Sequence, residues 1–140
     1  MTDEEFLAAF EKQAILRDDW SHEAHVRMTW LYCQQEPDFE SMLDKVRHGI
    51  QALNAINGVE GKLYHETVTV AFSSIIYARA TGARAARSWP VFRDGNRDLI
   101  DPGPSPLLSY YRKETLETDD ARLGFIAPDL QPLPGDAAII

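Results

Sequence analysis

Residues 38–58, DFESMLDKVRHGIQALNAING, decide the expected fold because they carry the clearest periodic pattern in the chain. Apolar side chains recur there every three or four residues, which is the spacing of one face of an α-helix. Asp38 is expected to cap the start of this helix, and Asn57 with Gly58 to end it. The apolar positions are Phe39, Met42, Leu43, Val46, Ile50, Leu53 and Ile56.

Helical patterns also lie on both sides of this stretch. Ser21 is a good N-cap for a helix that runs to about residue 35, and this helix is apolar on more than one side, so we expect it to be central. A further helix is expected from Tyr64 or His65 to about residue 80. The β-branched residues at 67–70 leave a strand as the rival interpretation, but the alternation fails from Ala71 onward.

The two ends of the chain complete the expected fold. A short helix capped by Thr2 or Asp3 opens the sequence, and short helices are expected at 107–111 and, capped by Thr118, at 119–125. Prolines follow from Pro128 onward, so residues 127–140 are expected as an extended surface tail that packs on the helical domain or extends from it. The sequence therefore predicts an all-α, compact single-domain bundle of four main helices at 1–126, with short C-terminal helices and a proline-containing tail.

Composition and charge limit the expected partners. The 140 residues are 44% hydrophobic and 26% charged, which is typical of a globular domain, and the formal net charge is −8. This charge repels nucleic-acid phosphates and anionic lipid, so we expect neither partner. Arg79, Arg84 and Arg87 form the one basic stretch, and we interpret them as the solvated end of a helix.

A reducing compartment fits the single cysteine, Cys33. The N-terminus is acidic where a signal peptide needs positive charge, and no apolar run approaches the ~20 residues of a membrane span. We therefore expect a cytoplasmic protein. It is expected as a monomer, or as a homodimer through the surplus apolar surface of the helices at 21–35 and 65–80.

Three of the four histidines lie in two short motifs, Trp-Ser-His-Glu-Ala-His at 20–25 and Tyr-His-Glu-Thr at 64–67. His22 and His25 share one face of a helix, because three residues cover about 300° of rotation. With His65 at the start of another helix they would resemble the three protein ligands of a catalytic zinc. Metal-activated water would then support hydrolysis, with Glu66 as general base.

Other interpretations of the two motifs stay open. With Glu66 as a fourth ligand, the site would suit nonhaem iron or manganese and oxidation chemistry, and zinc, iron and nickel are the ions we would test. The alternative is a noncatalytic module that binds a small ligand or a protein, in which the histidine cluster is purely structural. Residues expected to line a pocket or to orient the histidines are Trp20, Ser21, Tyr64 and Thr69.

Four further side chains are weighed as site residues and set aside. His48 is expected to face solvent, opposite the apolar stripe of its helix. Cys33 lies ~16 Å along the helix from His22, which is too far for the two side chains to share an ion. As a lone cysteine it is expected to be a small buried hydrophobic residue rather than a nucleophile. Arg27 and Arg47 could bind a carboxylate substrate, but we expect both to be solvated.

Four segments together resemble a group of small uncharacterised bacterial proteins of about this length. They are Trp-Ser-His-Glu-Ala-His-Val at 20–26, Gly-Ile-Gln-Ala-Leu-Asn at 49–54, Tyr-His-Glu-Thr-Val-Thr at 64–69 and Ala-Arg-Leu-Gly-Phe-Ile-Ala-Pro-Asp-Leu at 121–130. The resemblance implies a bacterial stand-alone domain and transfers no activity. In architecture the chain also loosely resembles DinB-like bundles, in which three histidines surround a divalent metal, although there the histidine pair follows the single histidine.

Overall fold

The computed structural model describes residues 1–58, 64–82 and 85–134, and the described residues form helices and turns without a β-strand. This confirms the all-helical expectation. The α-helices are α1 (Asp3–Glu11), α2 (His22–Gln35), α3 (Phe39–Ile56), α4 (Glu66–Thr81), α5 (Trp89–Gly95), α6 (Lys113–Leu116) and α7 (Asp119–Leu123). Short 3-10 helices span Arg17–Asp19, Arg97–Leu99 and Pro106–Ser109.

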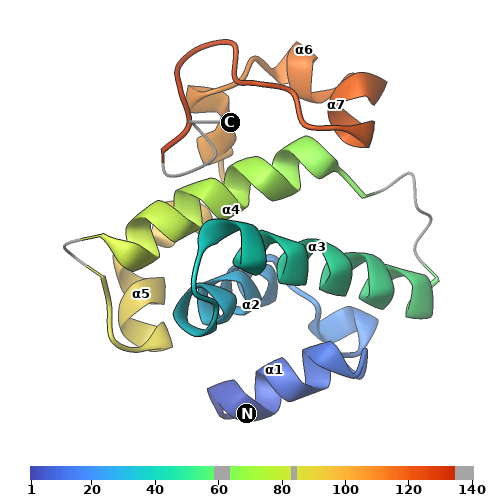
Figure 1. Ribbon diagram of the computed structural model, residues 1–140, viewed down its shortest axis with the longest axis vertical. Helices are drawn as coiled ribbons and strands as arrows, with labels where there is room; N and C mark the ends of the chain where they lie inside the picture. The colour runs from blue at the N-terminus through green and yellow to red at the C-terminus, as the bar shows by residue number, and fades with distance from the viewer. Residues whose placement is uncertain (59–63, 83–84, 135–140) are drawn as a thin grey trace.

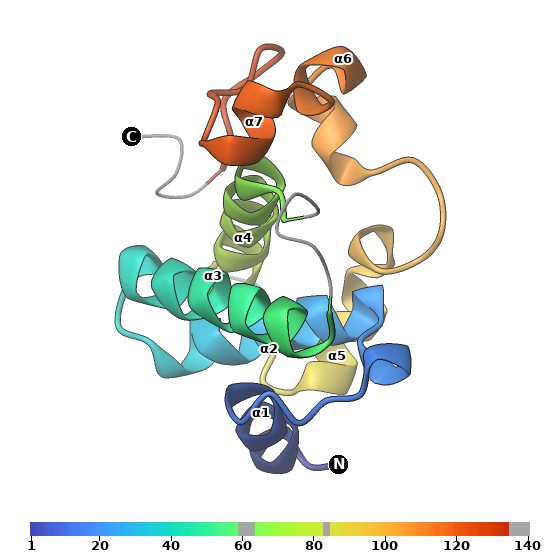
Figure 2. The same ribbon diagram turned by 90° about the vertical axis from the view of Figure 1, so that its right-hand side faces the viewer.

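The helices are stacked in layers (Figure 1). α1 lies at one end, α2 and α3 lie side by side above it, α4 crosses over them, and the C-terminal segment with α6 and α7 covers the far side of α4. The view from the side shows the same order (Figure 2). α2 contacts α1, α3, α4 and α5, so the prediction of a central second helix is confirmed.

Short-range signals set the helix starts as the sequence predicts. The Ser21 hydroxyl accepts the N–H of Ala24 at 3.1 Å, and the Asp38 carboxylate accepts the N–H of Ser41 at 2.8 Å. Such bonds satisfy amides that have no partner inside their own helix. Gly58 follows the end of α3 with a φ of 73°, in the left-handed region that favours glycine.

The core forms where the apolar faces of α1, α2, α3 and α4 meet. Phe10, Phe39, Met42, Leu53 and Ile76 are almost completely buried. Cys33 is also buried, and burial raises the pKa of its thiol to about 12, so it is the inert, apolar residue expected from the sequence.

The C-terminal segment is fastened to the beginning of α4. The Thr67 hydroxyl donates to Gly124 O at 2.9 Å and accepts the N–H of Ile126 at 3.0 Å. Further along, Leu133 is only 2% exposed. The tail thus packs on the helical domain through Leu133, whose apolar side chain joins the core between two prolines. Residues 135–140 of the tail lie outside the described residues.

The last third of the chain departs from the sequence prediction in detail. The expected helix at 107–111 is a 3-10 helix over Pro106–Ser109, where Leu107 O accepts the N–H groups of both Tyr110 and Tyr111. The helix capped by Thr118 is confirmed, but it ends at Leu123. α6 was not predicted, because a distant residue holds its start: the Asp129 carboxylate accepts the N–H of Arg112, the residue before α6, at 3.0 Å.

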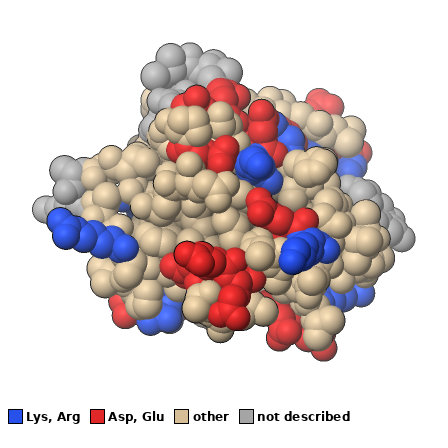
Figure 3. Space-filling model, turned by 60° about the horizontal axis from the view of Figure 1, so that its bottom comes forward, with Lys and Arg blue, Asp and Glu red and all other residues tan. Residues whose placement is uncertain are grey.

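Charge is mixed over the visible surface. On the face shown in Figure 3, acidic side chains gather near the middle, and basic side chains lie scattered among them rather than in one patch. Arg79 pairs with Asp98 at 2.8 Å, whereas Arg84 of the same basic stretch lies outside the described residues. Within the described ranges, no helix is long and apolar enough to cross a membrane.

Candidate functional site

The first turn of α2 places two imidazoles one turn apart. The Nε2 of His22 lies 2.7 Å from Leu99 O, and the Nδ1 of His25 lies 3.0 Å from Ser21 O. A carbonyl oxygen can only accept, so the ring N–H of each histidine must be on these nitrogens. The remaining nitrogens, Nδ1 of His22 and Nε2 of His25, carry lone pairs when the rings are neutral. Neither has a hydrogen-bond partner in the described part of the chain.

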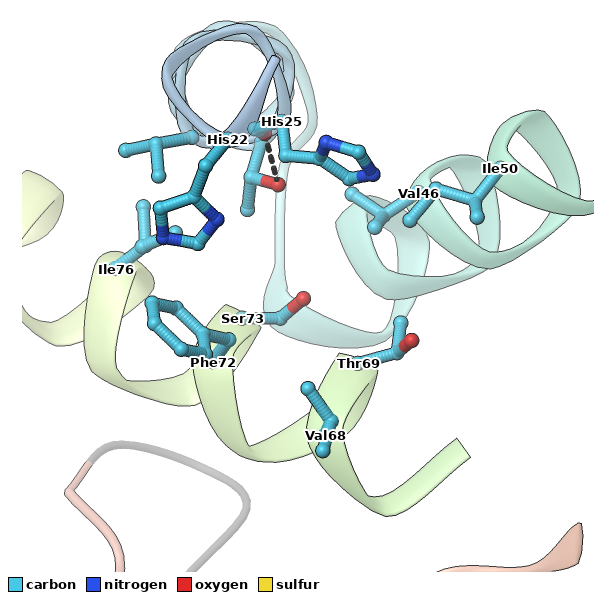
Figure 4. A pocket seen from close by; sticks show the side chains of 11 residues that line it. His22, His25, Val46, Ile50, Val68, Thr69, Phe72, Ser73 and Ile76 are labelled. Atoms are coloured by element: carbon cyan, nitrogen blue, oxygen red, sulfur yellow. Dashed lines mark hydrogen bonds between the residues drawn. The ribbon is translucent and has the colours of Figure 1, made fainter. Parts of the chain in front are cut away.

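Both histidines line a cavity of about 340 Å³ between α2, α3 and α4, which we term the α2–α4 cavity (Figure 4). Its apolar wall consists of Val26, Val46, Ile50, Val68, Phe72 and Ile76. Its polar groups are His22, His25, Thr29, Thr69 and Ser73. His25 points toward the α3 side and His22 toward Phe72 of α4, so the two rings reach different parts of the same space.

Aromatic neighbours fix the orientation of the two rings. The indole of Trp20 lies against His25 with ring centroids 4.0 Å apart, and Phe72 meets His22 edge-on at 5.5 Å. Burial lowers the pKa of His25 below its usual value, the hydrogen bond to Ser21 O opposes this shift, and the charge of His22 adds to it. His25 is therefore a neutral hydrogen-bond acceptor near neutral pH.

His65 lies elsewhere and is not among the residues that line the cavity. Its Nδ1 accepts the N–H of Val68 at 3.1 Å, so His65 is the N-cap of α4. Its Nε2 lies 2.7 Å from Leu116 O and donates to it. Both ring nitrogens of the third predicted metal ligand are thus occupied by the backbone.

Glu66 is bound by two side chains. Its carboxylate accepts from the Arg47 guanidinium, with distances of 3.0 Å to Nε and 2.7 Å to Nη2, and from the Tyr64 hydroxyl at 2.7 Å. Burial alone would raise the pKa of Glu66, but the hydrogen bonds from Arg47 and Tyr64 outweigh it and lower this pKa. Burial and the bond to Glu66 raise the pKa of Tyr64 to about 12.

The structure corrects the expectation that Arg27 and Arg47 are solvated. Arg47 faces the start of α4 and forms the ion pair with Glu66 described above. Arg27 pairs with Asp3 at 2.7 Å and lies over the ring of Phe6. Both arginines find carboxylates contributed by another helix, which the pattern along a single helix cannot reveal. His48 is exposed as predicted.

The predicted site residues thus separate into two groups. His22, His25 and Thr69 line the cavity, with Ser21 and Trp20 holding His25, whereas Tyr64, His65 and Glu66 form bonds around the start of α4. Among residues 1–58, 64–82 and 85–134, no three His, Cys, Asp or Glu side chains are grouped to hold a metal ion.

The sequence prediction missed Ser73 and the contribution of α3 to the cavity. Val46 and Ile50 stand in the predicted apolar stripe, and Thr29 shares a helix face with His22. The periodic pattern shows which side chains turn inward. It cannot show that these side chains leave a space unfilled, because the helix crossing decides that.

No protein-family model, curated protein or solved structure matches this chain. The functional proposals below therefore depend on the cavity and on the side chains around it.

Proposed function

We propose that the protein binds a small, mainly apolar molecule in the α2–α4 cavity. In this proposal α1 to α4 act as a four-helix bundle that holds the site, and the C-terminal segment supports α4 from outside. The observation that carries the proposal is a space of about 340 Å³ with a predominantly apolar wall and a few polar groups. Small-molecule sites commonly have this composition and volumes of about 300–1,000 Å³.

The apolar wall supplies the driving force for binding. Transfer of apolar surface from water is favourable by roughly 25 cal/mol per Å², and the walls contributed by α3 and α4 are aliphatic side chains and one phenyl ring. Val26 and Val46 are 1% exposed, so the wall is held firmly by the core behind it. A ligand would enter a site that is already formed.

Methyl NMR with naphthalene as the probe tests this proposal. We expect shift changes in the methyl groups of Val46, Ile50, Val68 and Ile76, which line the cavity. Ser73→Leu should fill the space and remove the changes, because Ser73 is buried on the cavity wall. His48→Leu is the matched control, since His48 is exposed on α3 and outside the cavity.

A folded wild-type protein whose cavity methyl groups do not respond to naphthalene at its solubility limit would overturn the proposal. An equal response in the wild type and in folded Ser73→Leu would also do so, because the probe would then occupy another place.

A metal-dependent enzyme of the hydrolase type is the second candidate function. It is favoured by one observation: each imidazole donates one ring N–H to a backbone carbonyl and leaves the other nitrogen unbonded among the described residues. Metal-binding histidines are usually oriented in this way. The two rings reach different parts of the cavity, so they would have to turn toward each other to hold one zinc, iron or nickel ion. The ion would take its other ligands from water or from the bound molecule, and metal-bound water has a pKa of about 7.

The full three-histidine version of this candidate requires rearrangement. His65 would have to release Leu116 O, and Glu66 would have to release Arg47 before it could act as a base. Elemental analysis of untagged protein, and thermal unfolding with added zinc, iron or nickel, test it. We expect a stoichiometric metal and a stabilisation that His25→Ala removes and His48→Ala keeps; a metal-free protein that no ion stabilises would exclude it.

A further inference from the structure

The polar groups of the α2–α4 cavity indicate which hydrogen-bonding group its ligand carries. This inference depends on the proposed function. The backbone carbonyls of Leu99 and Ser21 hold the N–H groups of His22 and His25 away from the cavity. In the neutral rings, the nitrogens left for a ligand, Nδ1 of His22 and Nε2 of His25, are acceptors only. The α2 wall therefore offers hydrogen-bond acceptors and no imidazole donor.

The opposite wall carries one hydroxyl that is free to bind. Ser73 is 2% exposed, and its hydroxyl has no hydrogen-bond partner within the described residues. Figure 4 shows this hydroxyl directed from α4 into the space below the two imidazoles. Thr29 and Thr69 differ, because their hydroxyls already donate to His25 O and His65 O at 2.9 Å each. Ser73 can both donate to and accept from a ligand.

The cavity does not suit an anionic ligand. No lysine or arginine is among the described residues that line it, and most of its wall is apolar. A carboxylate would place its charge beside two acceptor lone pairs and an apolar wall, without a compensating cation. An uncharged donor group instead satisfies the acceptors.

We propose that the α2–α4 cavity selects an uncharged molecule with an aromatic or aliphatic body and one O–H donor, a phenol or an alcohol, whose hydroxyl donates to an imidazole of His22 or His25. The Ser73 hydroxyl can donate to the same ligand oxygen. The apolar body then lies against the wall formed by α3 and α4. A methyl ether of the same body binds more weakly because it lacks the O–H donor, and a carboxylate of the same body binds more weakly because it carries a charge.

Three probes with one common body test this selectivity on the full chain. Naphthol, methoxynaphthalene and naphthoate are titrated near neutral pH, and their dissociation constants are measured from the methyl shifts of Ile50 and Ile76. We expect naphthol to bind more tightly than methoxynaphthalene, by roughly two- to tenfold for a net neutral hydrogen bond. Naphthoate should bind most weakly of the three.

Two variants locate the acceptor. His22→Phe and His25→Phe keep a ring and remove the lone pair, so the preference for naphthol over methoxynaphthalene should disappear in the variant that loses the bound imidazole and persist in the other. His48→Phe, at an exposed position outside the cavity, should behave as the wild type. If a variant fails to fold, the comparison of the three probes in the wild type still tests whether the cavity requires an O–H donor.

The outcomes separate this inference from the proposed function. If methoxynaphthalene binds as tightly as naphthol, or naphthoate binds most tightly, the donor requirement is wrong while the cavity remains a binding site. If both histidine variants fold and keep the full preference for naphthol, the assignment of the imidazoles is wrong. If none of the three probes and not even naphthalene shifts the cavity methyl groups, the proposed function fails and this inference fails with it.

Discussion

The indole of Trp20 covers the imidazole of His25, with ring centroids 4.0 Å apart and planes inclined by 37°. Trp20 also stacks against Phe10 of α1, with ring centroids 5.3 Å apart. This chain of rings connects the core of α1 to the cavity. The environment of His25 is therefore set partly by a residue that precedes α2 and that does not itself line the cavity.

Replacement of Trp20 should change the titration of His25. Trp20→Leu removes part of the cover that keeps the imidazole away from water, so the pKa of His25 should rise toward its usual value. Histidine ring resonances followed through a pH titration measure this shift. Trp89→Leu is the control, because Trp89 is also a tryptophan packed on the core, more deeply buried than Trp20, but its neighbours are Trp30 and Phe92. An unchanged His25 titration in Trp20→Leu would contradict the expectation.

Stability should fall as the pH drops through the histidine range. The pKa of His25 is lower in the folded protein than the usual 6.5, so below that pH the unfolded chain binds a proton that the folded chain does not. The free energy of unfolding then decreases with decreasing pH, above the range in which carboxylates titrate. His25→Gln should flatten this part of the pH profile, whereas His48→Gln should not, as measured by urea unfolding at a series of pH values.

Glu66 should contribute to stability and not to ligand binding. Glu66→Ala removes charge-assisted hydrogen bonds to Arg47 and Tyr64 and should lower the free energy of unfolding by about 1–3 kcal/mol. Asp44→Ala removes an exposed partner of the same arginine and should cost less than about 1 kcal/mol. Naphthalene should bind both variants equally well. Weaker naphthalene binding by Glu66→Ala alone would contradict this and would mean that the Glu66 carboxylate contributes to the binding site.

Gly49 should resist substitution even though it lies inside α3. A Cβ at this position would overlap the ring of Phe10, which is completely buried and packed against Trp20 and Tyr32. Gly49→Ala should therefore destabilise by about 1–3 kcal/mol from overpacking, reduced by the ~1 kcal/mol that alanine gains in a helix. Gly95→Ala, where no atom of the described residues lies within 4 Å of the added Cβ, is the control and should be neutral or stabilising in thermal unfolding.

The sequence predicts those parts of this fold that depend on neighbours along the chain. Ser21, Asp38 and Thr118 cap their helices as expected, because a capping bond spans only three residues. The stripe of α3 likewise predicts its buried face as far as Leu53, whereas Ile56 at the end of the stripe is 65% exposed. Helix type, start and inward face could all be obtained in this way.

The bonding partners of the histidines could not be predicted from the sequence. His22 binds Leu99 O, which lies 77 residues away, and His65 binds Leu116 O, 51 residues away. These contacts depend on how α2 and α4 pack against later segments. The sequence motifs correctly place His22 and His25 side by side, but the similarity of the two motifs does not bring His65 into the same cavity.

The attachment of α4 to the C-terminal segment also implies an order of assembly during protein synthesis. The Nδ1 of His65 accepts the N–H of Val68, only three residues further along the chain. The Thr67 hydroxyl accepts the N–H of Ile126, which is 59 residues further along and is synthesised much later. The residues of the cavity are all synthesised before this later bond can close, and closing a long loop costs more entropy than closing a short one. The C-terminal segment should thus be the last to fold and the first to open, with faster hydrogen exchange at the Ile126 amide than at Val68.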